Sequence, residues 1–203
     1  LARRGAIVHE VLNVNQIISD YTQSPEHEML MRYHPNIQVT TDLDPDLLNI
    51  LGSTVHLTKM IMNLVSNAAE SIQDEGTVSL SSKNQHVDIP ISGIDLVPAG
   101  DYVVLTISDT GKGISPDDRK KIFEPFYTKK TMGRSGTGLG MTVVRGTMED
   151  HGGYIDILSM DDVGTKFRLY LPATRKELMK KIISDSIEAY RGHEHILVVD
   201  DVK

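Results

Sequence analysis

The chain of 203 residues contains no cysteine. Disulfide bonds and thiolate metal sites are therefore excluded, and the composition fits a reducing cytoplasm. No stretch approaches the ~20 consecutive apolar residues that cross a bilayer, so the sequence predicts no membrane contact by this chain. The first residues, 1–5, have neither the apolar core of a signal peptide nor an initiator methionine. We therefore expect a piece of a longer protein.

An excess of positive charge is missing as well. The formal net charge is −7, and because nucleic-acid binding needs clustered Lys and Arg, no nucleic-acid partner is expected. The one dense basic stretch, from Lys129 and Lys130 to Arg134, lies beside a run of glycines, where it suits a small polyphosphate. With 39% hydrophobic and 24% charged residues, the composition is that of a globular domain with one sizeable core.

Hydrophobic periodicity predicts mixed strands and helices, and hence an α/β fold. The pattern at 12–21 indicates a strand that runs into a short helix, and Ser24-Pro25 begins a helical turn. Apolar residues from Val55 to Ile72 follow one helical face, with Ser53 as the N-cap and Gly76 as the stop. Further strands are expected at 37–43, 77–84, 101–108, 154–159 and 165–171, and further helices at 116–122, 138–151 and from Pro172 to about Tyr190.

The segment from Val103 to Ile107 is rich in β-branched residues, which predicts a central, buried strand. Asp109 follows at its carboxyl end, where α/β proteins usually place ligands. A carboxylate there accepts a hydrogen bond from the exocyclic amine of adenine and repels the oxygen that guanine presents instead. Gly111 and Gly113 allow backbone angles closed to other residues and let a ligand approach closely.

The same Asp109-Thr-Gly triplet, after an apolar strand, also occurs in aspartic proteases. That chemistry needs two such aspartates sharing one proton. This chain has one triplet, and Lys112 stands where a small apolar residue is expected, so only a homodimer would supply the second carboxylate. The protease interpretation is therefore poorly supported.

Asn63 and Asn67 lie four residues apart on the predicted helix, so both side chains project from one face. Amide oxygens are hard ligands suited to Mg²⁺, which usually keeps several waters and takes phosphate oxygens as further ligands. The alternative is a solvated face of an amphipathic helix. We expect Asn67 and Asn63 to be the metal-binding pair.

Gly136-Thr-Gly-Leu-Gly140 opens a helix, and backbone N–H groups at a helix N-terminus bind anions. The spacing is neither the dinucleotide G-x-G-x-x-G nor a Walker motif, and the eukaryotic-type kinase motifs are absent. We expect this segment to bind phosphate groups. Its candidate residues are Gly136, Gly138, Leu139 and Gly140.

Four motifs in a fixed order carry a family resemblance. Asn63-Leu-Val-Ser-Asn67-Ala, Asp109-Thr-Gly-Lys-Gly113, Phe123-Glu-Pro-Phe126 and Gly136-Thr-Gly-Leu-Gly140 resemble the N, G1, F and G2 boxes of sensor histidine kinases, whose superfamily includes DNA gyrase B and a heat-shock chaperone. The resemblance implies a two-layer α/β sandwich, with a mixed β-sheet and about three helices on one face. It also implies ATP or ADP with Mg²⁺ as ligands.

The resemblance extends to residues outside these boxes. Thr165 matches a threonine that reaches adenine through water, and residues 127–135 look like a lid that closes over ATP. Lys129 and Lys130 would then neutralise phosphate charge. Phe123 and Phe126 would pack the base of the lid against the core.

Asn63 stands where ATP-hydrolysing relatives have a glutamate general base. An amide accepts no proton at neutral pH, so the resemblance implies phosphotransfer to another protein group, and no certain catalytic residue. Glu70 is the nearby acid that would assist, unless it forms a surface ion pair. An ATP-hydrolysing conformational machine and a non-catalytic nucleotide-binding module remain alternatives.

The resemblance also implies a phospho-accepting histidine, which we do not find here. His9-Glu10-x-x-Asn13 copies the acceptor motif, but a second helix must intervene before the ATP-binding domain, and too few residues separate His9 from Asn63. Residues 1–11 are expected to end that second helix of the dimerisation hairpin, and 12–173 to form the catalytic domain. A helical linker is expected at 174–192.

The last residues, 193–203, end in an apolar run followed by Asp200 and Asp201. This pattern resembles the first strand of a receiver domain, although a plain terminal strand would look the same. The parent protein is then expected to be a cytoplasmic hybrid kinase, whether or not it has a membrane anchor. It would be a homodimer whose partners are its own dimerisation hairpin and a receiver domain.

Overall fold

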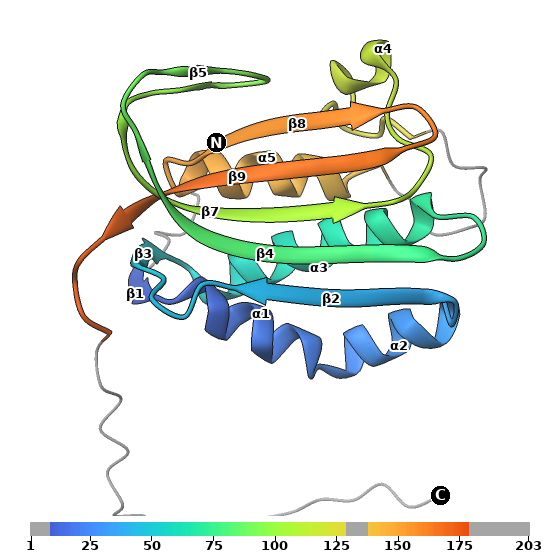
Figure 1. Ribbon diagram of the computed structural model, residues 1–203, viewed down its shortest axis with the longest axis horizontal. Helices are drawn as coiled ribbons and strands as arrows, with labels where there is room; N and C mark the ends of the chain where they lie inside the picture. Colours follow the sequence, from blue (N-terminus) through green and yellow to red (C-terminus); the bar gives the residue numbers. More distant parts are fainter. Residues whose placement is uncertain (1–8, 129–137, 179–203) are drawn as a thin grey trace, which may run out of the picture.

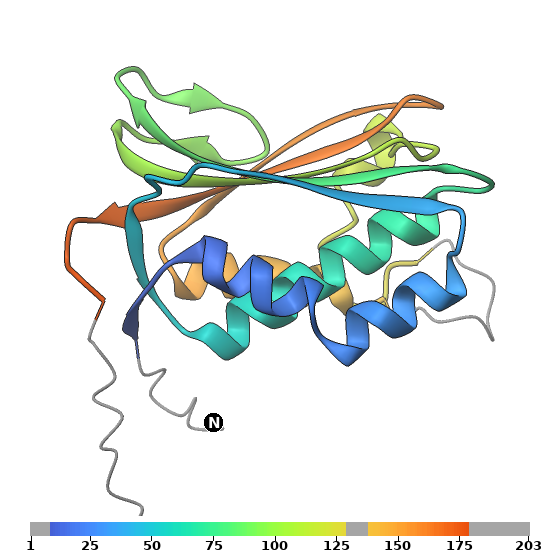
Figure 2. The same ribbon diagram turned by 60° about the horizontal axis from the view of Figure 1, so that its bottom comes forward.

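The structure, a computed structural model, describes residues 9–128 and 138–178. Helices α1, α2, α3 and α5 lie along one face of a mixed β-sheet (Figures 1 and 2). The helices are α1 (Val14–Thr22), α2 (Pro25–Tyr33), α3 (Thr54–Ser71), α4 (Pro116–Arg119) and α5 (Gly140–Asp150). The strands are β1 (Glu10–Leu12), β2 (Ile37–Leu43), β3 (Asn49–Gly52), β4 (Gly76–Val87), β5 (Ile91–Ser92), β6 (Leu96–Val97), β7 (Gly100–Asp109), β8 (Tyr154–Met160) and β9 (Gly164–Thr174). The predicted two-layer α/β sandwich is confirmed, with four helices on the covered face instead of about three.

The sheet has the order β1-β3-β9-β7-β4-β2, and β8 pairs with β9. Strand β7 is central, because it lies antiparallel between β4 and β9 over most of its length. Its residues from Tyr102 to Leu105 are buried on both faces of the sheet, as the β-branched run predicts. Asp109 is the last residue of β7 and pairs with Thr165 of β9. The sheet therefore presents this carboxylate at one of its ends.

Helix α3 is the main helix of the core. Its residues Leu57, Met60, Ile61, Leu64 and Val65 are at most 2% exposed, and they recur at the three- and four-residue spacing of one helical face. The same helix contacts α1, α5 and the two central strands β4 and β7. Its position is thus set by apolar packing along most of its length, while its opposite face remains free to carry polar residues. Within the described ranges, no helix has the combined length and apolarity that a bilayer crossing requires.

A short hairpin, β5–β6, covers part of the outer face of the sheet (Figure 2). Beneath it, Val97, Tyr102, Val104 and Tyr170 form a second, smaller apolar cluster. Asp95, in the hairpin turn, accepts hydrogen bonds through Oδ2 from the Ile155 backbone N–H (2.8 Å) and through Oδ1 from Arg145 Nη1 (2.7 Å). The hairpin thereby pairs with the exposed edge of β8 and connects it to α5. Protecting a free edge in this way is a common device of β-sheet proteins.

His151 joins the start of α3 to the end of α5. Its Nε2 accepts a hydrogen bond from the Ser53 backbone N–H (2.9 Å), and Nδ1 lies 2.7 Å from the Thr147 carbonyl oxygen. This pattern assigns the proton of the neutral ring to Nδ1. The ring stacks on His9 at 5.3 Å between centroids, and His56 lies edge-on at 6.5 Å. Burial lowers the pKa of His151, and the neighbouring His9 and His56 lower it further.

Several expected boundaries differ from the structure. Residues 10–12 form β1, which pairs with β3, so the expected boundary after residue 11 cuts through a strand. Helix α3 ends at Ser71, and Gly76 begins β4, where a Cβ atom would lie 2.4 Å from Thr110 Oγ1. Ser53 is the N-cap residue of α3, but its side chain makes no capping hydrogen bond.

The helix expected from Pro172 is wrong for the residues that the structure describes. Pro172 lies in β9, opposite Tyr102, and residues 175–178 are not helical. The pairing of β9 with β8 ends at Tyr170. Pro172 lies just beyond this point, where β8 no longer requires a backbone N–H from β9. Residues 179–203, which include most of the expected linker and the receiver strand, lie outside the described residues.

The environment of His151 predicts that stability falls in mild acid. The ring is held neutral in the folded protein, whereas in the unfolded chain it binds a proton below about pH 6.5. Its contribution is therefore complete above that pH and is lost as the pH falls below it. Between about pH 7.5 and pH 5.5, the drop in melting temperature should be roughly 2–4 °C smaller in His151→Gln than in the wild type. Equal drops in the two proteins, measured by circular dichroism, would contradict this assignment.

Candidate functional site

The carboxylate of Asp109 is buried, with 8% of the residue exposed. Its Oδ1 accepts a hydrogen bond from the Gly111 backbone N–H (2.9 Å), and the Ser71 hydroxyl lies 3.0 Å from the same oxygen. Burial raises the pKa of Asp109 above its ordinary value, while these donors and the Thr165 backbone N–H act to lower it. The carboxylate is thus desolvated and is oriented from two sides by the protein. Its second oxygen retains lone pairs for a ligand.

Three glycines allow close backbone packing around Asp109. A Cβ atom on Gly111 would lie 1.9 Å from Ser71 Oγ, and one on Gly164 would lie 2.0 Å from the Asp109 carbonyl oxygen. Gly113 has a φ of +76°, and a Cβ there would lie 2.3 Å from the Met160 carbonyl oxygen. The loop after β7 therefore packs directly against the end of α3 and the β8–β9 turn. Side chains at these positions would push it away.

Thr165 lies beside Asp109 at the end of the sheet and is 4% exposed. Its Oγ1 is 2.9 Å from Ser159 Oγ, which also accepts the Ile114 backbone N–H at 2.7 Å. The structure thus brings the predicted residues Asp109, Gly111 and Thr165 together at one place. Ser159 connects Thr165 to the loop that contains Gly113.

The polar stripe of α3, defined as Asn63, Asn67 and Ser71, has a spacing of four residues and so lies on one face of the helix. Over eight residues an α-helix rises about 12 Å. Ser71 at one end contacts Asp109, and Asn63 at the other end lies beside the start of α5, where a Cβ atom on Gly140 would be 3.2 Å from Asn63 Oδ1. The stripe therefore connects Asp109 to the glycine-rich segment.

Asn63 also has an unusual hydrogen-bonding state. Its Nδ2 is buried and has no hydrogen-bond partner among the described residues. An unpaired buried amide is costly, so such a group points to a missing acceptor. Asn67 is partly buried and already engaged in an interaction within the protein.

The start of α5 has the geometry of an exposed helix N-terminus. Leu139 is the N-cap residue and has no side-chain capping bond, and Gly140 begins the helix. Gly138 has a φ of +67°, and a Cβ atom there would lie 2.5 Å from the backbone carbon of Phe126. The Phe126 N–H donates to the Gly138 carbonyl oxygen at 3.0 Å. Glycine is therefore required at position 138 for the two backbones to meet.

The two phenylalanines between these motifs behave differently. Phe123 packs against the core. The Arg145 guanidinium lies over its ring, with Arg145 Cζ 5.6 Å from the centroid of the Phe123 ring. Phe126 is 74% exposed and adopts a φ of +66°. The expectation that both rings pack against the core is therefore correct for Phe123 and wrong for Phe126.

The remaining predicted residues do not form part of the described cluster. Glu70 lies on α3 beside the polar stripe, and its carboxylate accepts a hydrogen bond from Ser66 Oγ at 3.1 Å. Lys129, Lys130 and Gly136 lie outside the described residues.

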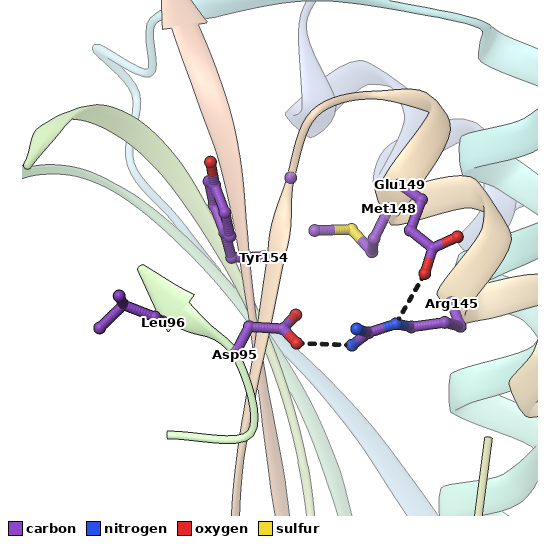
Figure 3. Close-up of a pocket in the computed structure, with 7 residues that line it drawn as sticks. Asp95, Leu96, Arg145, Met148, Glu149 and Tyr154 are labelled. Atoms are coloured by element: carbon purple, nitrogen blue, oxygen red, sulfur yellow. Dashed lines mark hydrogen bonds and ion pairs between the residues drawn. The ribbon is translucent and has the colours of Figure 1, made fainter. Parts of the chain in front are cut away.

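A cavity of about 320 Å³ lies elsewhere, between the β5–β6 hairpin, α5 and β8 (Figure 3). Arg145 bridges Asp95 and Glu149 at its rim, and Leu96, Met148 and Tyr154 provide apolar walls. The guanidinium is neutralised by both carboxylates, and none of the predicted site residues lines this space. The candidate site is therefore the polar stripe of α3, which this cavity does not include.

Sequence reasoning missed Ser71 and Ser159. Ser71 is the third member of a four-residue series that begins with Asn63 and Asn67, so the helical spacing carried a usable signal. Ser159 is placed by the pairing of β8 with β9, which no short-range pattern reveals.

Comparisons with known proteins agree with the motif order. Residues 52–175 match the family model described as histidine kinase-, DNA gyrase B- and HSP90-like ATPase. The sensor histidine kinase ZraS of Salmonella typhimurium is 31% identical over 177 residues, which cover 87% of this chain and 34% of that protein. The sensor kinase CckA of Brucella abortus is 32% identical over 178 residues, or 87% of this chain and 18% of that protein. The chain thus spans 34% and 18% of the lengths of these two relatives.

Solved structures show the same fold. The mycobacterial sensor histidine kinase MprB superposes with a TM-score of 0.63 at 24% identity, covering 82% of this chain and 98% of that one. The catalytic domain of the histidine kinase ThkA gives 0.64 at 24% identity, with 82% and 97% coverage. Full-length ShkA in complex with AMPPNP gives 0.64 at 22% identity, with 86% and 34% coverage.

The contact between Gly111 and Ser71 predicts a position-specific effect of alanine. Gly111→Ala forces the loop away from α3 and should reduce the free energy of unfolding by about 1–3 kcal/mol. Gly146→Ala in α5 is the matched control, because no atom lies within 4 Å of the added Cβ, and it should stabilise the helix by roughly 0.5–1 kcal/mol. Urea unfolding of both variants measures the difference. A Gly111→Ala protein as stable as the wild type would contradict the packing described.

Proposed function

Since the chain belongs to the family of histidine kinase-, DNA gyrase B- and HSP90-like ATPases, we propose that it is the ATP-binding catalytic domain of a two-component sensor histidine kinase. It transfers the γ-phosphate of ATP to a histidine on a separate dimerisation domain, from which the phosphoryl group passes to a receiver aspartate. The observation that carries the proposal is the polar stripe of α3, which connects the buried carboxylate of Asp109 to the glycine-rich start of α5.

Asp109 is proposed to recognise adenine. A carboxylate held by Ser71 and Gly111 through one oxygen can accept the adenine amine through the other. The close approach of Gly111 and Gly113 to the rest of the protein keeps side chains out of the space that the base would enter. Thr165, next to Asp109 in the sheet, is proposed to contact the base through water.

The phosphates are proposed to lie between α3 and the start of α5. The N-terminal N–H groups of α5, from Gly138 through Gly140, have the polarity that phosphate oxygens require. The unpartnered Nδ2 of Asn63 lies beside Gly140 and supplies a further donor. We also propose phosphate contacts for Gly136, Lys129 and Lys130. Their assignment rests only on the sequence motif.

Asn67 and Asn63 are the residues that would hold Mg²⁺. Their amide oxygens are hard donors, and they lie on the face of α3 that runs from Asp109 to the phosphate end, so the residues present fit the ion. Bound there, Mg²⁺ neutralises phosphate charge.

The proposed reaction is a direct transfer. A ring nitrogen of the acceptor histidine forms the new N–P bond, the bond between the γ-phosphorus and its bridging oxygen breaks, and ADP leaves with that electron pair. The imidazole is itself a nucleophile, so the catalytic domain contributes positioning and charge neutralisation. Asn63 has no basic group with which to activate water, and this favours transfer over the alternative of ATP hydrolysis. Glu70, on α3 beside the stripe, is proposed as the acid that would assist.

The partners follow from this proposal. They are the dimerisation hairpin of the same protein, which would make the full-length protein a homodimer, and a receiver domain. Residues 193–203 are proposed to begin a receiver domain in the same chain, after a linker at 174–192. The proposed location of this domain is the cytoplasm.

A reconstituted transfer assay tests the proposed activity. The chain is mixed with a dimerisation hairpin from a related sensor kinase and γ-³²P-ATP, with and without Mg²⁺. We expect label on the hairpin, lost when its histidine is replaced by alanine, and at least about tenfold less label with Asn67→Ala. Rapid phosphate release with no label on the hairpin would favour the hydrolase alternative. ADP binding without either reaction would favour a non-catalytic module.

Removing the charge of Asp109 should reduce base selectivity. In Asp109→Asn the amide can rotate to offer its N–H₂ group to the guanine oxygen, so the preference for ADP over GDP should fall by about tenfold or more. Asp101→Asn, at the exposed opposite end of the same strand, is the matched control and should keep the wild-type preference. Competition of both nucleotides against a fluorescent ADP measures the ratio. An unchanged ratio in Asp109→Asn would contradict the assigned role.

A further inference from the structure

Ser71 is the last residue of α3, and no motif includes it. We propose that Ser71 is a positioning residue for base recognition, which fixes Asp109 in the orientation that selects adenine and couples it to the end of the helix that carries Asn67. This inference rests on the proposed function of the site. It assigns Ser71 no contact with the nucleotide.

The first observation is the geometry at the carboxylate. Ser71 Oγ and the Gly111 N–H approach the same oxygen, Oδ1, at 3.0 and 2.9 Å. Two donors on one oxygen fix the rotation of the carboxylate plane, so the other oxygen is presented in a single direction. Without the Ser71 hydroxyl, the carboxylate keeps only the backbone N–H groups of Gly111 and Thr165 as donors, and no side chain of α3 fixes its rotation about the broad Cβ–Cγ torsion.

The second observation is a double connection between Ser71 and the loop after β7. The Ser71 carbonyl oxygen accepts the Lys112 backbone N–H at 3.2 Å, while its side chain reaches Asp109. The absence of a Cβ atom on Gly111 is what allows this contact, because one would lie 1.9 Å from Ser71 Oγ. The backbone connection survives replacement of the side chain. A change at position 71 therefore tests the hydroxyl separately from the fold.

The third observation is that the hydroxyl has a second acceptor. Ser71 Oγ lies 2.8 Å from the Ala68 carbonyl oxygen within its own helix, and a hydroxyl has one hydrogen to donate. When Asp109 is ionised, the charged oxygen is the stronger acceptor. When Asp109 is protonated, the hydrogen can return to Ala68 without leaving a buried group unpaired. The contact thus stabilises the ionised carboxylate selectively.

No charged side chain of the described residues contributes to the pKa shift of Asp109, which results from burial and from the bonds to Gly111, Ser71 and Thr165. Ser71 is the one side chain among these donors. Its hydroxyl is therefore the contact that a substitution can remove without altering the backbone.

The experiment compares the wild type with Ser71→Ala and Ser71→Thr in two measurements. The first is the ratio of ADP to GDP affinity with Mg²⁺. The second is the pH titration of the Asp109 carboxyl by ¹³C NMR in the nucleotide-free protein, which does not depend on nucleotide binding. Thr58→Ala, near the start of the same helix, is the control, because Thr58 lies outside the polar stripe. Melting temperatures confirm that each variant is folded.

We expect Ser71→Ala to raise the pKa of Asp109, so that its titration midpoint lies about one pH unit higher. The ADP-to-GDP ratio should fall about tenfold. Ser71→Thr should restore most of both properties, and Thr58→Ala should leave both unchanged.

Two outcomes overturn the inference in distinguishable ways. If the wild type selects ADP and Ser71→Ala selects it equally well, Ser71 has no positioning role, while the proposed function stands. If the wild type binds no ADP, the proposed function is contradicted. The inference is then contradicted as well, even if Ser71→Ala shifts the titration of the Asp109 carboxyl.

Discussion

The structure depends on one buried carboxylate at the end of its central strand. Removing a carboxylate from water is costly unless donors replace the lost solvent, and for Asp109 these donors come from the loop after β7 and from the end of α3. The contact with α3 requires glycine at position 111, where a Cβ atom would lie 1.9 Å from Ser71 Oγ. Helix α3 ends at Ser71, one turn beyond Asn67, so its last residue reaches this carboxylate. The apolar face of α3 sets its position, and its polar stripe then extends from the carboxylate to the start of α5.

Much of the fold could be predicted because its signals are local. The β-branched run before Asp109 predicted a central strand, and the helical spacing of apolar residues predicted α3. The strand β3 and the β5–β6 hairpin were not predicted. Both are short, and β3 is defined by its pairing with the distant strand β9. Pro172 was taken as a helix start, whereas its position in β9 depends on where the neighbouring strand β8 ends.

In the candidate site, too, the residues with local sequence signals were predicted and the long-range contacts were not. The motif residues Asp109, Gly111 and Thr165 come together as their order along the chain suggested, and Asn63 lies beside Gly140. The contacts that hold them were not foreseen. Ser71 meets Asp109 across 38 positions, and His151 meets Ser53 across 98. A short motif records which residues a ligand requires, while the residues that orient them are set by tertiary packing, which single-sequence patterns do not contain.

The central claim is that adenine is bound by Asp109, which contacts one end of the polar stripe, and that the metal is bound by Asn67 within the stripe. The most direct measurement is a crystal structure of the chain soaked with Mg²⁺ and a non-hydrolysable ATP analogue. The account predicts that the adenine amine lies within hydrogen-bond distance of Asp109, and that Mg²⁺ is coordinated by Asn67 between α3 and the phosphates. A nucleotide bound away from these two residues, for example in the cavity beside Arg145, would contradict it.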